Sequence, residues 1–181
     1  MLTQLQRTRL LDVARQSIAA VLNGRPPDWK ADDFDDDLRR PSGAFVTLNT
    51  REGDLRGCIG SIQAVEPLYK AVASSAVNAA FRDPRFFPIE KRELDDIHLE
   101  ISVMGPIERV TDIETIEVGR DGLIIRKGGY AGLLLPQVAT DYGWDRLQFL
   151  RQTCVKAGLP PDAWEAPGTL IEKFSAEVFG E

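Results

Sequence analysis

Two apolar segments joined by a short polar segment limit what this chain can fold into. Residues 43–48 and 55–62 are rich in the apolar and β-branched side chains that favour strands. Residues 50–54 between them are polar and contain a glycine, which is typical of a tight turn. The pattern predicts an antiparallel β-hairpin. Because hairpins rather than strand–helix–strand units recur along the chain, we expect an α+β fold with an antiparallel sheet flanked by helices.

The remaining patterns predict helices and strands on either side of this hairpin. Apolar residues at helical spacing predict a helix that Thr3 caps and that ends near Gly24. Residues 67–81 predict a helix with mostly small side chains, which we expect to lie tightly against the hairpin at Gly57 or Gly60. Residues 97–104 alternate in polarity and predict a strand. Further expected elements are a hairpin over residues 122–135, helices from 136 and over 145–157, and a strand over 170–179.

Length and charge bound the organisation and the class of partner. The chain has 181 residues, which favours one domain over residues 1–181, with a smaller β-hairpin lobe within about 105–135. Its net charge of −6 and the lack of a Lys/Arg run argue against a nucleic-acid surface. The segment 25–42 contains five aspartates within residues 32–37, and we expect it to be a solvated surface loop.

Cysteine usage and hydropathy favour a cytoplasmic protein. The two cysteines lack the spacing of a disulfide framework, which is consistent with a reducing compartment. Residues 1–11 lack the apolar core of a signal peptide, and no window reaches the length of a membrane span. We therefore expect no membrane association. We also expect no metal and no cofactor, because the single histidine, His98, and the cysteines show no ligand spacing.

The central candidate site is the segment 55–60, with the sequence LRGCIG. Strand alternation places Arg56, Cys58 and Gly60 on one face. A nearby guanidinium favours the thiolate form of a cysteine, and Gly60 would leave an open notch beside the sulfur. We therefore assign Cys58 and Arg56 as candidate catalytic residues. The alternative is that Cys58 packs as a small apolar side chain and that Gly57 and Gly60 permit close packing.

Five further residues are candidates for binding a small-molecule ligand around this segment. Gly57 and Gly60 would make room for the ligand, and Asn78 is the polar residue of the small-residue helix. Arg85 would add a second cation near Cys58 or form a local ion pair with Asp83. Gln137, at the start of a predicted helix, would bind the ligand or cap the helix. We do not assign His98 or Cys154 to the site, because their patterns indicate a strand face and a helix core, respectively.

The segment 55–60 and several others, in the same order, resemble the AMMECR-type domain family, also called AmmeMemoRadiSam system protein A. The hexapeptide LRGCIG is the signature of that family. The further matching segments are 43–48 (GAFVTL), 83–86 (DPRF), 100–103 (EISV), 122–123 (GL), 135–139 (LPQVA), Trp144, 149–150 (FL) and 156–159 (KAGL). The resemblance implies an α+β fold with a larger and a smaller lobe, and a hexapeptide near the cleft.

The resemblance also implies partners, although it implies no defined reaction. The family's system name associates it with a Memo-like protein and a radical SAM protein, which suggests a shared modification pathway. The chain itself lacks the CxxxCxxC loop of a radical SAM enzyme. Two functions therefore remain open. One is an enzyme or enzyme component that uses Cys58 as a thiolate, and the other is a non-catalytic binding or scaffold module in which LRGCIG is structural.

Overall fold

The computed structural model describes residues 1–181, which form two compact units. One unit contains residues 1–104 and 177–181, and the other contains residues 105–176. The six strands are hydrogen-bonded in the order β2-β1-β3-β6-β4-β5. The long strands β3 (His98–Arg109) and β6 (Leu170–Gly180) each begin in one unit and end in the other. The expected α+β class, with an antiparallel sheet and helices, is confirmed.

The predicted hairpin forms the edge of the sheet in the first unit. Strand β1 (Ala44–Asn49) pairs antiparallel with β2 (Leu55–Ser61), and a turn closed by a hydrogen bond from Thr50 N–H to the Asp54 carbonyl joins them. On its other side β1 pairs antiparallel with β3. Strand β2 is therefore an edge strand, and its outer backbone groups have no neighbouring strand.

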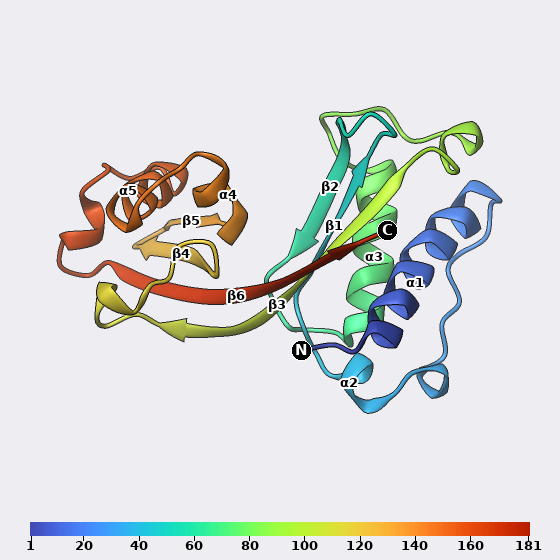
Figure 1. Ribbon diagram of the computed structural model, residues 1–181, viewed down its shortest axis with the longest axis horizontal. Coiled ribbons are helices and arrows are strands. Elements are labelled where there is room, and N and C mark those ends of the chain that lie inside the picture. The colour runs from blue at the N-terminus through green and yellow to red at the C-terminus, as the bar shows by residue number, and fades with distance from the viewer. The chain divides into compact units, whose positions relative to one another are not determined.

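Two helices cover one face of these strands (Figure 1). Helix α3 (Leu68–Phe81) lies against β1 and β2, and helix α1 (Gln4–Leu22) packs beside α3. Thr3 begins α1 with a capping box, as the sequence predicts. Past its end, Gly24 has a φ of 71°, a conformation that favours glycine. The core between sheet and helices is a single cluster that includes Leu10, Ile18, Val46, Leu48, Val72, Ala76 and Ile101.

The small side chains of α3 bring it close to the hairpin. A Cβ atom placed on Gly57 would collide with the carbonyl oxygen of Ala79 and would lie 3.1 Å from its carbonyl carbon. No residue larger than glycine fits at position 57 unless α3 moves. The expected tight contact between the helix and the hexapeptide is therefore confirmed, and Gly57 rather than Gly60 provides it.

The acidic segment after α1 is more ordered than expected. It contains a short 3-10 helix, η1 (Ala31–Asp33), and helix α2 (Asp36–Arg39). Phe34 between them is buried and stacks on Tyr69 with ring centroids 4.1 Å apart. Leu38 is also buried. The aspartates are exposed to solvent, as expected. The side chains of Phe34 and Leu38, however, attach the segment to the core, so the expectation of a simple surface loop was wrong.

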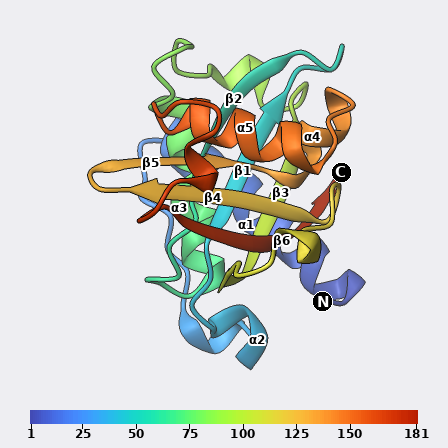
Figure 2. The same cartoon turned by 90° about the vertical axis from the view of Figure 1, so that its left-hand side faces the viewer.

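The second unit is built on the hairpin of β4 (Asp121–Lys127) and β5 (Tyr130–Leu134). Its turn uses Gly128 at a φ of 58°. Helices α4 (Pro136–Asp141) and α5 (Arg146–Lys156) lie beside the hairpin (Figure 2). This unit extends beyond the 105–135 segment expected for the small lobe, because α5 packs against the hairpin around a core that includes Leu123, Ile125, Phe149, Leu150 and Cys154.

The remaining short elements are 3-10 turns. These are η2 (Lys91–Glu93), η3 (Ile113–Thr115) and η4 (Ala163–Glu165). In β6, Glu172 interrupts an otherwise apolar pattern of alternate residues. Its carboxylate lies 2.9 Å from the guanidinium of Arg126 on the neighbouring strand β4, so a cross-strand ion pair accounts for it. None of the helices combines the length and apolarity needed to cross a bilayer.

Candidate functional site

Cys58 projects from the face of the sheet opposite to the helices. Its neighbours in β2 face the other way, since Gly57 lies against α3 and Ile59 packs on the core cluster. Across the sheet, Cys58 is paired with Thr47 of β1, and Thr47 is paired with Glu100 of β3. The three side chains form one row on this face. The Cys58 side chain is partly exposed, so a reagent can reach it.

The hydroxyl of Thr47 is the polar group that contacts the Cys58 sulfur. Its Oγ1 atom lies 3.2 Å from Sγ. At this distance the hydroxyl can donate to a thiolate, or accept from a thiol. No sequence pattern indicated Thr47. The hairpin shifts its register by one residue between the turn and this pair, and the shift places Thr47 rather than Val46 opposite Cys58.

Arg56 makes its contacts with the segment that follows α3 rather than with the sulfur. Its Nε and Nη2 atoms donate to the Glu93 carboxylate at 2.8 and 3.3 Å, and Nη1 donates to the Phe87 carbonyl at 3.0 Å. Hydrogen bonding from Arg56 lowers the pKa of Glu93. None of these contacts involves Cys58. The geometry therefore gives Arg56 a role in fastening residues 87–93 to β2, a role that no local pattern indicated.

Asp83 binds the backbone of Cys58 from beyond the edge of the sheet. Its Oδ2 atom accepts the Cys58 N–H at 2.9 Å. The carboxylate is buried, and Arg85 donates to it from Nε at 3.0 Å and from Nη2 at 2.7 Å. Arg85 Nη2 also lies 3.4 Å from the Cys58 carbonyl oxygen. The Asp83–Arg85 pair therefore satisfies both backbone groups of Cys58 on the side where β2 has no strand partner.

The charges of this pair reinforce each other. Hydrogen bonding from Arg85, followed by that from the Cys58 N–H, holds the pKa of Asp83 well below its usual range despite burial. Hydrogen bonding to Asp83 raises the pKa of Arg85. Both alternatives from the sequence are realised, since Arg85 forms the ion pair and also brings a half-exposed cation to Cys58.

The open notch expected at Gly60 is filled. Phe45, which pairs with Gly60 across the hairpin, lies over it, and a Cβ on Gly60 would be 2.5 Å from Cγ of the Phe45 ring. The expectation of free space beside the sulfur at this position was therefore wrong. The physical reason is that a glycine in a strand leaves a gap that a cross-strand aromatic side chain can occupy.

Asn78 does not share a face with Cys58, and Gln137 belongs to the other unit. Asn78 lines a separate cleft between α3 and the Trp29 segment, on the helix side of the first unit. Gln137 belongs to the second unit, at the second position of α4, where its carbonyl accepts the Thr140 hydroxyl at 2.8 Å. Their binding roles remain predictions.

The other chemically notable side chains lie elsewhere. His98 is exposed at the start of β3 and pairs with Asn49, two positions from Thr47. Cys154 is fully buried in the core of the second unit, and burial raises the pKa of its thiol. Its predicted core position is confirmed. No group of three or more His, Cys, Asp or Glu side chains is arranged to hold a metal ion.

Comparison with known proteins agrees with the fold and the motifs. The family model described as AMMECR1 matches residues 11–179. A protein of Methanothermobacter thermautotrophicus is 46% identical over 178 residues, which cover 95% of this chain and 92% of the relative. Protein TK0174 of Thermococcus kodakarensis is 43% identical over 181 residues, which cover 95% of this chain and 88% of the relative.

A solved structure shares both the fold and much of the sequence. The crystal structure of the uncharacterized protein PH0010 from Pyrococcus horikoshii matches with a TM-score of 0.85 and 42% identity. The match covers 95% of this chain and 89% of that one. The names of these relatives state no activity. The family model spans nearly the whole chain, and the relatives exceed 40% identity over most of it, so this chain belongs to the AMMECR1 family.

Proposed function

We propose that the chain binds a small-molecule ligand on the sheet face around Cys58 and presents the Cys58 thiolate to it. The observation that carries this proposal is the row formed by Cys58 and Thr47, in which a partly exposed sulfur lies 3.2 Å from a hydroxyl. The guanidinium of Arg85, with Nη2 3.4 Å from the Cys58 carbonyl oxygen, adds a cation that an anionic ligand could meet. Because the Asp83–Arg85 pair binds both backbone groups of Cys58, the sulfur has a fixed position, which a reactive site requires.

We propose further that this protein is the AmmeMemoRadiSam system protein A of a modification pathway, acting with a Memo-like protein and a radical SAM protein in the cytoplasm. The family assignment supports the proposal through the association in the system's name. Purification of a tagged chain from cells that express both partners tests it. We expect both partners to co-purify, and their absence at native expression levels would contradict the proposal.

Labelling of the two cysteines with iodoacetamide tests the role of Cys58 within one native protein. We expect Cys58 to react at a rate close to or above that of a free thiol at neutral pH, whereas buried Cys154 stays unlabelled. Mass spectrometry of peptides separates the two signals. Thr47→Val should slow the reaction of Cys58 and Thr47→Ser should preserve it. Equal protection of both cysteines would exclude a reactive thiol.

A second function is favoured by the structural use of the rest of the hexapeptide. Gly57 admits α3, Gly60 lies under Phe45, and Arg56 binds Glu93. In this alternative LRGCIG only builds the fold, and the chain is a binding or scaffold module. Cys58→Ser discriminates between the two functions. If the variant folds and fully complements a deletion strain, the scaffold role is supported, whereas loss of complementation with retained partner binding supports the thiolate.

A further inference from the structure

A second cleft lies on the helix side of the first unit, away from Cys58. It runs along the exposed side of α3 and is bounded on the other side by the segment that contains Trp29. Its volume is about 390 Å³, which is within the range of small-molecule sites. Because Cys58 projects from the opposite face of the sheet, this cleft is independent of the function proposed above.

One polar stripe of α3 lines the cleft. Lys70, Ser74, Asn78 and Arg82 follow one another at intervals of four residues. Residues four apart lie on the same side of a helix, about 6 Å apart along its axis. The stripe therefore presents an ammonium, a hydroxyl, an amide and a guanidinium along one wall of the cleft.

The two ends of this stripe differ in their balance of charge. At one end, Glu66 lies four residues before Lys70, and its carboxylate accepts the Ser74 hydroxyl at 2.9 Å. At the other end, Arg82 makes no ion pair and its guanidinium makes no hydrogen bond to the protein, unlike the paired Arg56 and Arg85. The Asn78 side-chain amide, one turn before Arg82, is also without a protein partner.

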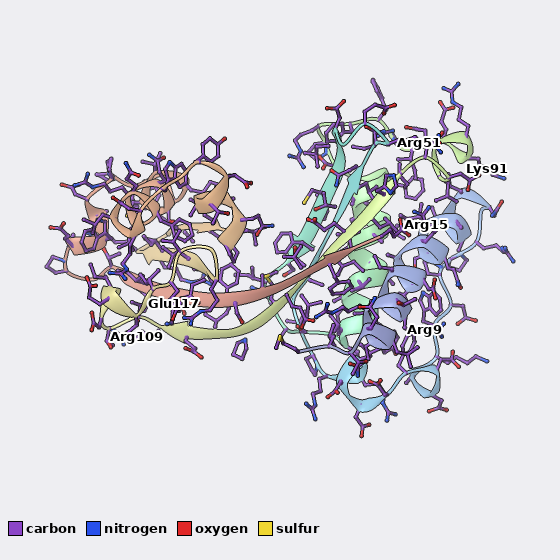
Figure 3. All side chains as sticks on the ribbon, in the orientation of Figure 1. Arg9, Arg15, Arg51, Lys91, Arg109 and Glu117 are labelled. Atoms are coloured by element: carbon purple, nitrogen blue, oxygen red, sulfur yellow. The ribbon has the colours of Figure 1, made fainter.

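Apolar side chains complete the walls. Val77 and Ala73 of α3 line the cleft between the polar positions, and Trp29 faces them. Trp29 is held in place, because its indole N–H donates to Ser17 Oγ at 2.9 Å. The guanidinium of Arg9, a residue of α1 (Figure 3), lies over the Trp29 ring, 5.5 Å from the ring centroid. A flat apolar group can therefore enter against a fixed aromatic wall.

We propose that this cleft binds a small organic anion that carries a flat apolar group. Its carboxylate or phosphate is held by the guanidinium of Arg82 and the amide N–H of Asn78, and its apolar part lies between Trp29 and Val77. In a protein with a net charge of −6, the unpaired cation at the Arg82 end of the cleft makes this end a local site of positive charge that attracts an anion. A guanidinium and an amide together supply directional donors to an oxyanion.

Titration with phenyl phosphate tests the proposal by NMR, with the Asn78 side-chain amide and the Trp29 indole N–H as reporters. We expect saturable shifts of both signals in the millimolar range or below. Inorganic phosphate should bind about tenfold more weakly, since it lacks the ring. Benzyl alcohol, which has the ring without the charge, should also bind about tenfold more weakly.

Three variants separate binding from structural roles. Arg82→Gln should weaken phenyl phosphate binding about tenfold, whereas Arg109→Gln, which removes an exposed arginine of the second unit, should change it less than twofold. Cys58→Ser should bind like the wild type, which keeps this test separate from that of the thiolate. If Arg82 serves only the C-terminal end of α3, Arg82→Gln will lower the melting temperature without changing the affinity, and the proposal is then wrong. Absence of saturable shifts at Asn78, or equal losses in Arg82→Gln and Arg109→Gln, would also overturn it.

Discussion

The buried carboxylate of Asp83 accepts the backbone N–H of Cys58 at 2.9 Å, across 25 positions of sequence. An edge strand normally leaves such groups to water or to another chain. Here the ion pair of Asp83 with Arg85 takes the place of the missing strand, because Arg85 also approaches the Cys58 carbonyl. The hexapeptide and the loop after α3 therefore form one structural unit, and the position of the sulfur depends on both.

Replacing Asp83 should destabilise the first unit. Asp83→Ala removes the partner of the Cys58 N–H and of Arg85, and we expect the free energy of unfolding to fall by about 2 kcal/mol. Arg85 is half exposed and can be rehydrated, which keeps the loss below that of a fully buried pair. Urea unfolding measures it. Asp36→Ala, which breaks an exposed ion pair with Arg39, is the control and should cost less than about 1 kcal/mol.

Acid should weaken the same interaction. The pKa of Asp83 is lower in the folded protein than in the unfolded chain. As the pH falls, the unfolded chain therefore binds more protons than the folded state, and unfolding is favoured. The stabilisation is complete above the unfolded value of about 3.9 and is lost progressively as the pH falls below it. Unfolding measured between about pH 5 and pH 2 should show a smaller loss of stability in Asp83→Asn than in the wild type. Parallel curves would show that Asp83 is not the responsible group.

Adding one methyl group at position 57 should separate α3 from the hairpin. The Cβ of Gly57→Ala would collide with the Ala79 backbone, which cannot rotate away as a side chain can. We expect a loss of about 1–3 kcal/mol in the free energy of unfolding. Gly129→Ala is the matched control, because a Cβ there meets no atom within 4 Å and Gly129 does not have a positive φ. Thermal unfolding of the two variants should differ clearly.

Cys154 should report the opening of the second unit. Its side chain is fully buried beside Phe149 and Leu150, so a reagent reaches it only when this core opens. In a Cys58→Ser background, labelling of Cys154 in native buffer should be at least about 10³-fold slower than in denaturing urea. Comparable rates under both conditions would mean that this unit opens readily without global unfolding.

The elements of this fold were largely predictable because their signals are local. The helix cap at Thr3, the turn before β2 and the Gly128 turn each follow from a few neighbouring residues. Strand alternation alone did not predict the register shift between β1 and β2, which leaves Arg56 without a partner in β1. The buried positions of Phe34 and Leu38 were missed because acidic neighbours dominate their segment, although both attach it to the core.

The sequence by itself determined the hairpin and the close approach of α3 at Gly57 or Gly60, because spacing and side-chain size specify them. Only the tertiary structure decided which arginine contacts Cys58. Arg56 is bound by Glu93, 37 positions away, while the Asp83–Arg85 pair reaches Cys58 from the loop after α3. The packing of the hairpin likewise decided that Phe45 occupies the space above Gly60. Such partners depend on which distant groups the packed backbone brings within hydrogen-bond distance, and no local pattern encodes that distance.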